Sequence, residues 1–285
     1  MPLPTLSIVT PSYQQGRYIE ATIRSVLNQT ISAEYIVMDG GSTDETVSVL
    51  RKYESQLKWI SEKDAGQADA VNKGVARTSG DILGWLNSDD TYEPGAFQIV
   101  LDTFAEHPEY DVIYGLADYI DPRGQFIAPA PHIEEFNKER LFTTANFLVQ
   151  PAVFFRRSAF DKVGGLDPSL HYVMDYDLWL KFARADLKIV HIPRLLAHYR
   201  WFGANKTAVG GNTRFDEIQR LMQQHGRTKL PGYIELEWIR QQAATGKIFG
   251  AMKSFFTSSQ AMKAILEPRW WKTILTGVKL RKVRE

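Results

Sequence analysis

The sequence of residues 82–90 is Ile-Leu-Gly-Trp-Leu-Asn-Ser-Asp-Asp. Its apolar first part predicts a buried strand over residues 82–86, which ends in a polar cluster from Asn87 to Asp90. Two adjacent carboxylates after a buried strand are costly to hold together unless a cation or hydrogen bonds neutralise them. Such oxygens suit Mg²⁺ or Mn²⁺ bridging a diphosphate; the alternative is a polar turn in which Asp90 caps the next helix.

Short apolar runs alternate with helix-like segments on both sides of this strand. Further strands are predicted at residues 6–10, 35–39, 59–60 and 112–114, and helices at residues 18–28, around 47–50, at 68–77 and at 94–107. This alternation predicts βαβ units and an α/β fold with a mostly parallel sheet. Ligands bind at the carboxyl ends of the strands in such sheets, where Thr10, Asp39 and the Asn87–Asp90 cluster all lie.

The second half of the chain has a less regular pattern. Strands are predicted at residues 153–155 and 189–192, and helices at residues 177–184, 212–224 and 233–244. The α/β pattern gives way to helices near residues 226–232. We therefore predict an α/β domain over residues 1–226 and a helical C-terminal extension over residues 227–285.

The composition excludes several classes of protein. The chain has 285 residues, 44% of them hydrophobic and 24% charged, which is ordinary for a globular protein that buries a full core. It has no cysteine, which excludes a thiol nucleophile, a disulfide and a thiolate metal site. A net charge of +1 argues against bulk nucleic-acid binding. With neither a secretory signal nor an apolar run of about 18 residues, we expect a cytoplasmic protein.

Asp175 and Asp177 lie at the start of the amphipathic helix predicted near residue 177. One of them is suited to be its N-cap, which stabilises a helix by ~1 kcal/mol. The other is then free to act as a general base. The spacing alone leaves open which residue takes which role, and for the motif taken alone the cap interpretation is favoured.

Two further segments carry polar residues suited to anions. In the first, Asp64 or Gln67 is placed to cap a helix, with Asn72 one turn later, and a helix start that faces a crevice favours anionic groups. In the second, Arg200 and Lys206 are placed to meet phosphate. The alternatives are an ordinary capped helix and a basic surface loop.

The C-terminal segment is basic and amphipathic. Residues 247–285 carry a net charge of +7, so residues 1–246 carry −6. Apolar residues recur at helical spacing in two stretches separated by Pro268, namely Phe249, Met252, Phe255 and Phe256, then Trp271, Ile274, Leu275 and Val278. This pattern fits an interfacial helix on an anionic membrane, and the alternative is packing against the α/β domain.

Taken together, these motifs resemble the family 2 glycosyltransferases, enzymes with the GT-A fold. The stretches that carry the resemblance are Ser7–Gln14, Ile23–Thr30, Val37–Asp44, Gly66–Gly74, Leu86–Asp90 and Met174–Trp179. They cover about residues 5–207, and their order and spacing are specific. The resemblance implies an α/β GT-A fold and a transferase that uses a nucleotide-diphosphate sugar and inverts the anomeric carbon.

The resemblance also implies roles for individual residues. The donor contacts that we expect are Thr10, Pro11, Asp39, Asn72, Asn87, Asp89, Arg200 and Lys206. Asp89 and Asp90 are expected to bind Mn²⁺ or Mg²⁺, and Asp175 matches the base that deprotonates the acceptor hydroxyl. The expected acceptor is a glycan or a lipid-linked glycan of cell-surface polysaccharide or glycolipid synthesis, which would place the protein at the inner face of the cell membrane.

The chain departs from the family pattern at several positions. Many members have an acid where this chain has Asn87 or Gly40, some have Glu where it has Met174, and some have His near Phe202. These departures motivate an alternative, a catalytically silent nucleotide-sugar-binding module of the same fold. A nucleotidyltransferase is disfavoured because there is no Gly-rich phosphate loop near the N-terminus.

Overall fold

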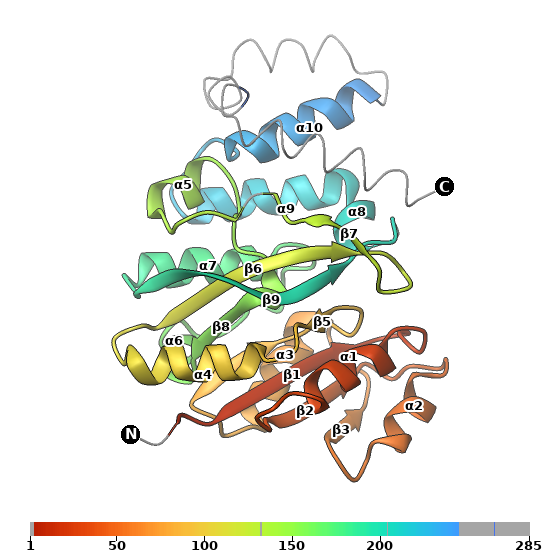
Figure 1. The fold of residues 1–285 in the computed structure, drawn as a ribbon. Coiled ribbons are helices and arrows are strands. Elements are labelled where there is room, and N and C mark those ends of the chain that lie inside the picture. The colour runs from red at the N-terminus through yellow and green to blue at the C-terminus, as the bar shows by residue number, and fades with distance from the viewer. Residues whose placement is uncertain (1–2, 132, 204, 245–264, 266–285) are drawn as a thin grey trace.

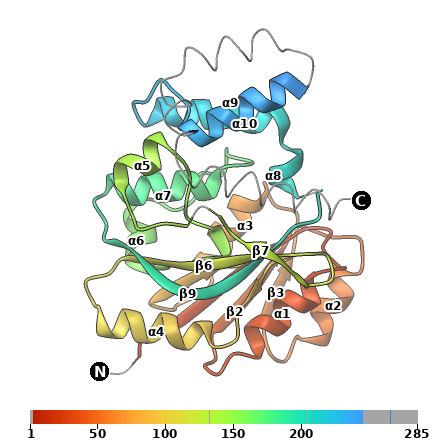
Figure 2. The same ribbon diagram turned by 45° about the horizontal axis from the view of Figure 1, so that its top comes forward.

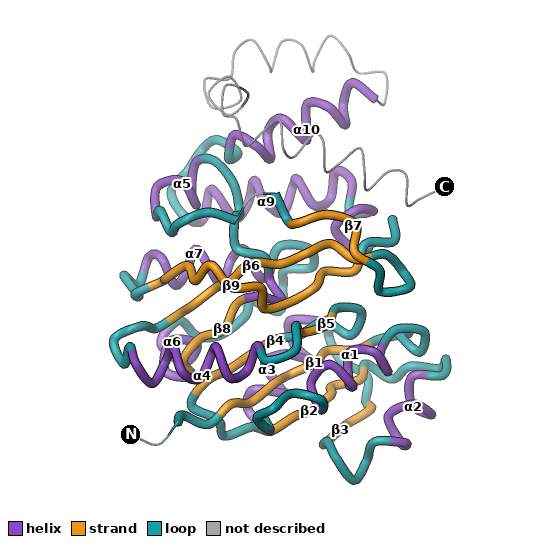
Figure 3. The backbone as a smooth tube through the Cα atoms, viewed as in Figure 1, coloured by secondary structure: helices purple, strands orange, loops and turns teal. Residues whose placement is uncertain are grey.

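The computed structural model describes residues 3–131, 133–203, 205–244 and 265, and these form an α/β fold around a single sheet (Figure 1). The sheet has nine strands in this part of the chain, in the order β3-β2-β1-β4-β8-β6-β9-β5, with β7 paired to β6 (Figure 3). The strands are β1 (Leu6–Ser12), β2 (Glu34–Asp39), β3 (Lys58–Ser61), β4 (Ile82–Trp85), β5 (Thr91–Tyr92), β6 (Val112–Ile120), β7 (Phe126–Pro129), β8 (Val153–Arg156) and β9 (Ile189–Arg200).

The first half of the sheet is parallel, as the strand–helix alternation predicted. β1 pairs in parallel with β2 and β4, and β2 with β3. The second half is mixed, because β8 runs antiparallel to β4 and to β6, while β6 and β9 are parallel. The carboxyl ends of β1, β2 and β4 therefore meet at one edge, where ligands bind in such sheets.

Helices cover both faces of the sheet. They are α1 (Ile19–Leu27), α2 (Thr46–Lys52), α3 (Gln67–Ala76), α4 (Ala96–Glu106), α5 (Lys138–Thr143), α6 (Arg157–Lys162), α7 (Met174–Arg184), α8 (Lys206–Val209), α9 (Gly211–Gln224) and α10 (Gly232–Ala244), with a 3₁₀ turn η1 (Gln150–Ala152). Figure 2 shows α1, α2 and α4 on one face and α3, α6 and α7 on the other, with α9 and α10 outside them. Each face buries its own apolar cluster against the sheet.

Helix α3 lies unusually close to β1 because of Gly74. A Cβ atom at this position would collide with the side chain of Val9. The close approach fixes α3 against the sheet, so its first residue, Gln67, lies near the carboxyl ends of the strands.

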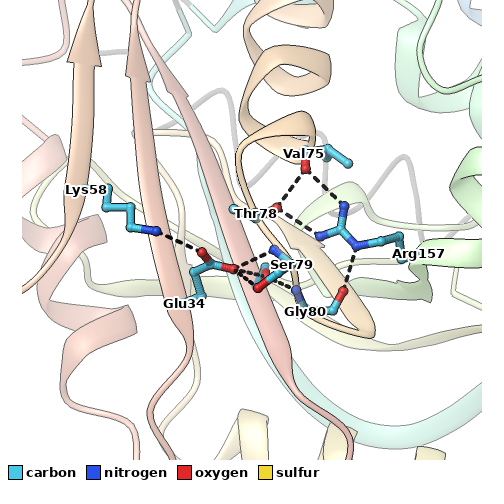
Figure 4. Close-up of polar contacts among 8 residues, drawn as sticks. Glu34, Lys58, Val75, Thr78, Ser79, Gly80 and Arg157 are labelled. Atoms are coloured by element: carbon cyan, nitrogen blue, oxygen red, sulfur yellow. Dashed lines mark hydrogen bonds and ion pairs between the residues drawn. The ribbon is translucent and has the colours of Figure 1, made fainter.

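Polar contacts hold the opposite, amino ends of the strands together (Figure 4). The Glu34 carboxylate accepts from Ser79 N at 2.7 Å, from Ser7 Oγ at 2.9 Å and from Lys58 Nζ at 3.1 Å. Burial acts to raise the pKa of Glu34, but these partners outweigh it and lower the pKa to about 2. Arg157 donates to the carbonyls of Gly80 and Val75, which joins α6 to the end of α3.

Helix α10, which follows residue 226, packs into the same core as α9, which precedes it. Phe215 and Ile218 of α9 and Ile234 of α10 belong to the apolar cluster that contains α3 and α7. No helix in the described part of the chain is long and apolar enough to span a bilayer. The amphipathic stretches predicted between Phe249 and Val278 lie outside the described residues apart from Ile265, and the division of the chain at residue 226 stays a prediction.

Candidate functional site

A cavity of about 810 Å³ opens at the carboxyl ends of β1, β2 and β4. Its wall comes from both halves of the chain, as the resemblance implied. The polar and aromatic residues that line it include Ser12, Tyr13, Lys63, Asp64, Gln67, Trp85, Asn87, Asp89, Gln150, His171, Tyr172, Asp175, Tyr199, Phe202 and Lys206. Of the predicted site residues, Pro11, Asn87, Asp89, Asp175 and Lys206 lie on this wall.

The ends of β1 and β2 shape one side of the cavity. Thr10 is buried, and its hydroxyl lies 3.2 Å from the Tyr35 hydroxyl. The Asp39 carboxylate accepts from Ser42 N and Oγ at 2.9 and 2.5 Å and from Ser61 Oγ at 2.6 Å. Neither Thr10 nor Asp39 lines the cavity. Their side chains form hydrogen bonds within the protein and support the cavity wall from behind.

Asp64 lies beside the position where many family members have a second acid. A Cβ atom at Gly40 would lie 2.9 Å from Asp64 Oδ2, and both residues line the cavity. The side chain of an acid at position 40 would thus lie beside the Asp64 carboxylate. Asp64 Oδ1 accepts from Gly66 N at 2.8 Å, but the predicted side-chain cap is absent, since Gly66 is the N-cap of α3 without a side-chain bond.

Asn87 is the centre of a chain of amide hydrogen bonds across the cavity wall. Its Oδ1 accepts from Gln67 Nε2 at 2.7 Å and from Trp85 Nε1 at 2.9 Å, and its Nδ2 donates to Gln150 Oε1 at 2.8 Å. Lys206 Nζ donates to Gln67 Oε1 at 3.2 Å. Because an amide has one accepting and one donating end, these partners fix the orientation of each amide in turn.

Asp89 and Asp90 differ in where their carboxylates lie. Asp89 is half-buried on the cavity wall, whereas Asp90 is 1% exposed and does not line the cavity. Asp90 Oδ1 accepts from Arg200 N at 2.9 Å, and the helix α4 has Gly95 as its N-cap, so the alternative in which Asp90 caps α4 is wrong. Burial raises the pKa of both carboxyls, and for Asp90 the adjacent Asp89 raises it further.

Arg200, predicted to bind phosphate, lies at the end of β9 with 3% of its surface exposed. Its guanidinium donates from Nε to Asp89 O at 2.7 Å and from Nη1 to Asp121 O at 2.9 Å, and it lies over the Tyr18 ring. Arg200 borders a smaller cavity of about 400 Å³ instead of the main one. The alternative, in which Arg200 belongs to a basic surface loop, is wrong because the residue is buried at the end of a strand.

The structure separates the two acids of helix α7. Asp175 is half-buried and lines the cavity. Asp177 is 3% exposed and faces away, 2.7 Å from Lys181 Nζ and 3.6 Å from His225 Nε2. Neither acid is the N-cap, which is Val173, so the cap prediction is wrong. Burial raises the pKa of Asp175, while backbone N–H groups and the charges of Arg214 and Lys206 oppose this.

The remaining predicted residues are Asn72 and Lys206. Asn72 bridges α3 to Leu166, accepting from its N–H at 3.0 Å and donating to its carbonyl at 2.9 Å, and it does not line the cavity. Lys206 is half-buried on the wall, and burial lowers its pKa while Glu217 and Asp175 raise it. Lys206 is thus the predicted phosphate contact that the fold brings to the cavity.

The side-chain oxygens on the cavity wall suit a cation that is also bound by a ligand. Within the described residues no three His, Cys, Asp or Glu side chains are grouped so as to hold a metal ion by themselves. Mg²⁺ is commonly held by one or two carboxylates together with substrate phosphates and water. Asp89, whose pKa is raised by burial although the charge of Arg200 opposes this, supplies one such carboxylate. Asn87 Oδ1 already accepts two hydrogen bonds and is not free to bind a metal.

Several wall residues were not predicted from the sequence. Gln150 lies in the short 3₁₀ turn η1, where the sequence has no motif, and His171 and Tyr172 precede α7. Asp64 and Gln67 also lie on the wall, whereas the sequence predicts them only as helix caps. The proximity of Gly40 to Asp64 comes from tertiary packing, so no local signal was available for it.

Comparisons with known proteins agree with this architecture. The sequence model of Glycosyl transferase family 2 matches residues 7–164. A chondroitin synthase of Escherichia coli is 31% identical over 185 residues, which cover 64% of this chain and 27% of the synthase. The chain therefore spans about a quarter of the length of that relative.

Two solved structures show the same fold at low sequence identity. S. aureus TarS 1–349 in complex with UDP-GlcNAc has a TM-score of 0.64 and 15% identity, and the match covers 99% of this chain and 82% of TarS 1–349. The Pyrobaculum calidifontis mannosyltransferase in complex with GDP-Man and Mn²⁺ has a TM-score of 0.66 and 15% identity, covering 100% of this chain and 88% of the mannosyltransferase. The GT-A fold expected from the sequence is thereby confirmed.

Proposed function

The chain belongs to glycosyl transferase family 2, and on that premise we propose that it transfers a sugar from a nucleotide-diphosphate sugar to an acceptor hydroxyl, with inversion. One observation carries this proposal. Asp89 and Asp175, from distant parts of the chain, line the same cavity at the carboxyl ends of the strands. A cation-binding carboxylate and a general base are the two groups that this reaction needs.

The donor occupies the part of the cavity built by the strand ends. We propose that the nucleoside lies against Pro11, Tyr13 and Asp64, with Thr10 and Asp39 supporting this wall from behind. The diphosphate then extends toward Asp89 and Lys206, which line the same cavity. The nucleotide sugars held by TarS and by the mannosyltransferase, both of this fold, support a nucleotide-sugar donor.

Asp89 is the proposed ligand of a divalent cation. A cation held there with the diphosphate would neutralise the charge that develops on the leaving group. The Mn²⁺ in the mannosyltransferase complex supports this assignment. Asp90 is also predicted to bind the cation directly. Because its carboxylate is buried, this binding requires the carboxylate to become accessible from the cavity.

Asp175 is the proposed general base. A carboxylate whose pKa is raised by burial accepts a proton more readily than an exposed one. The acceptor hydroxyl gives its proton to Asp175 as its oxygen bonds to the anomeric carbon. The nucleoside diphosphate leaves from the opposite face of the sugar with the bonding electron pair, so the configuration inverts. Holding donor and acceptor in line supplies much of the rate enhancement.

We propose a glycan, free or lipid-linked, as the acceptor, in the synthesis of cell-surface polysaccharide or glycolipid. The similarity to a chondroitin synthase supports a glycan product. The basic C-terminal segment supports contact with an anionic membrane surface, since each Lys or Arg near such a surface adds up to ~1 kcal/mol of attraction. Sedimentation with anionic vesicles, comparing the full chain with K272E/K279E/R281E/K282E, tests this contact; equal binding would refute it.

A catalytically silent binding module is the second candidate, favoured by the saturated hydrogen bonding of Asn87. One experiment separates the two candidates. The protein is screened by thermal shift against nucleotide sugars with and without Mn²⁺, and the stabilising donors are tested for release of nucleoside diphosphate. Release that depends on Asp175 supports the transferase. Stabilisation without release or transfer supports the module, and absence of any stabilisation contradicts both.

A further inference from the structure

Helix α9 carries a buried acid, Glu217, that the proposed reaction does not use. Its side chain is 4% exposed. Oε1 accepts from His171 N at 2.9 Å, and Oε2 accepts from Tyr172 N at 2.7 Å. Both carboxylate oxygens therefore hold consecutive backbone N–H groups of one segment.

The segment that Glu217 holds leads directly to the proposed base. His171 and Tyr172 line the cavity and lie just before α7, whose first turn contains Asp175. The N-cap of α7 is Val173, which provides no side-chain bond. The two bonds from Glu217 are thus side-chain restraints on the backbone that enters the helix.

Glu217 also contributes charge to the site. The negative charges of Glu217 on α9 and Asp175 on α7 act on Lys206, whose Nζ lies 6.0 Å from the centre of the Tyr172 ring. Burial lowers the pKa of Lys206, and the negative charge of Glu217 is the strongest factor that raises it. Burial likewise lowers the pKa of His171, and Glu217 again opposes the change. The same carboxylate therefore fixes a backbone segment and favours the charged form of Lys206.

We propose that Glu217 is a positioning residue that sets the acceptor side of the site by holding the backbone of His171 and Tyr172, which leads into the helix turn that carries Asp175. This inference rests on the proposed function, in which the acceptor hydroxyl approaches Asp175. The proposal makes α9 part of the active site, although this helix lies beyond the residues 7–164 matched by the family model. The nucleoside wall at the strand ends does not involve Glu217, which acts on the donor side only through its charge on Lys206.

The first test compares E217Q with the matched control D216N in the full chain. The amide of E217Q places an N–H₂ group against one backbone N–H and displaces the segment, whereas Asp216 is exposed on the same helix. We expect kcat/KM for the acceptor to fall about 10- to 100-fold in E217Q. Donor KM should change much less, because E217Q leaves Lys206 in place and removes only the charge of Glu217 that acts on it, and D216N should behave as wild type.

The second test separates geometry from charge and needs no activity. E217D keeps the charge but shortens the reach by one methylene, so it should lose acceptor kcat/KM as E217Q does. Hydrogen exchange of the His171 and Tyr172 amides should quicken in both variants, while amides of β1 keep their protection. Because exchange is independent of turnover, a failed proposed function and a failed role for Glu217 give different results.

Two outcomes would overturn the proposal. One is wild-type acceptor kinetics in E217Q or in E217D. The other is an equal loss of donor and acceptor kinetics together with faster exchange throughout the sheet, which would make Glu217 a residue of general stability only. Should E217Q fail to fold, E217D decides between the same outcomes.

Discussion

The backbone N–H of Arg200 donates to Oδ1 of Asp90 at 2.9 Å, joining residues 110 positions apart. The side chain of the same arginine donates to the Asp89 carbonyl at 2.7 Å. One residue at the end of β9 therefore holds both acids of the turn after β4. The direction in which Asp89 faces the cavity thus depends on the second half of the sheet.

Replacing Arg200 with Met should destabilise the protein by about 2–4 kcal/mol, because it leaves the carbonyls of Asp89 and Asp121 without their donors. Chemical denaturation measures this loss. Arg123→Met, an exposed change near the same small cavity, is the control and should cost little. An unchanged denaturation midpoint in Arg200→Met would show that the turn does not need this side chain.

Asp175→Asn should keep donor binding and lower the transfer rate by about 10²-fold or more, the usual scale for a lost general base. The comparison is Asp177→Asn, which should retain turnover but melt at a lower temperature, because it removes the buried partner of Lys181 and His225. Rates under saturating donor and thermal melts measure both effects. If Asp177→Asn loses turnover while Asp175→Asn keeps it, the assignment of the base is wrong.

The activity of the wild-type protein should fall on the acidic side as Asp175 is protonated. Since the pKa of Asp175 is raised, this fall should begin at a higher pH than for an ordinary aspartate. A pH profile of kcat/KM measures it. Loss of activity only at the pH where an exposed aspartate titrates would contradict the raised pKa.

Asp89→Asn should weaken the Mn²⁺-dependent part of donor binding at least about tenfold, because it removes the carboxylate that faces the cavity. Isothermal titration with a donor nucleotide, with and without Mn²⁺, measures the change. Asp161→Asn on the exposed surface of α6 is the control. Identical Mn²⁺ dependence in wild type and Asp89→Asn would exclude the metal role.

Glu34→Gln should lower stability at pH 7 by about 1–3 kcal/mol, because the folded pKa of Glu34 is depressed to about 2 from a reference of 4.5. A depressed pKa stabilises the fold above the unfolded pKa, and that stabilisation is lost as pH falls from about 4.5 toward 2. The gap between wild type and variant should therefore close over this range. Urea denaturation at pH 7, 4 and 2.5 measures it, and a constant gap would contradict the linkage.

Much of the secondary structure could be predicted from local patterns. The strands predicted at residues 6–10 and 35–39 and the helix at 68–77 are confirmed as β1, β2 and α3. Period-two and period-3.6 apolar patterns are local, and burial on one face of a sheet or helix enforces them. β5, β7, α5, α6 and α8 were missed because they are short and follow no such period.

The sequence by itself determined the family, the parallel half of the sheet and the motifs whose residues reach the cavity. These features depend on local pattern and spacing. Tertiary structure alone decided which acid of each pair faces inward. Asp89 and Asp90 are chemically alike, but only Asp90 meets the N–H of Arg200, and only Asp177 meets Lys181 and His225. Burial and partners come from strands and helices distant in sequence, and no local pattern records them.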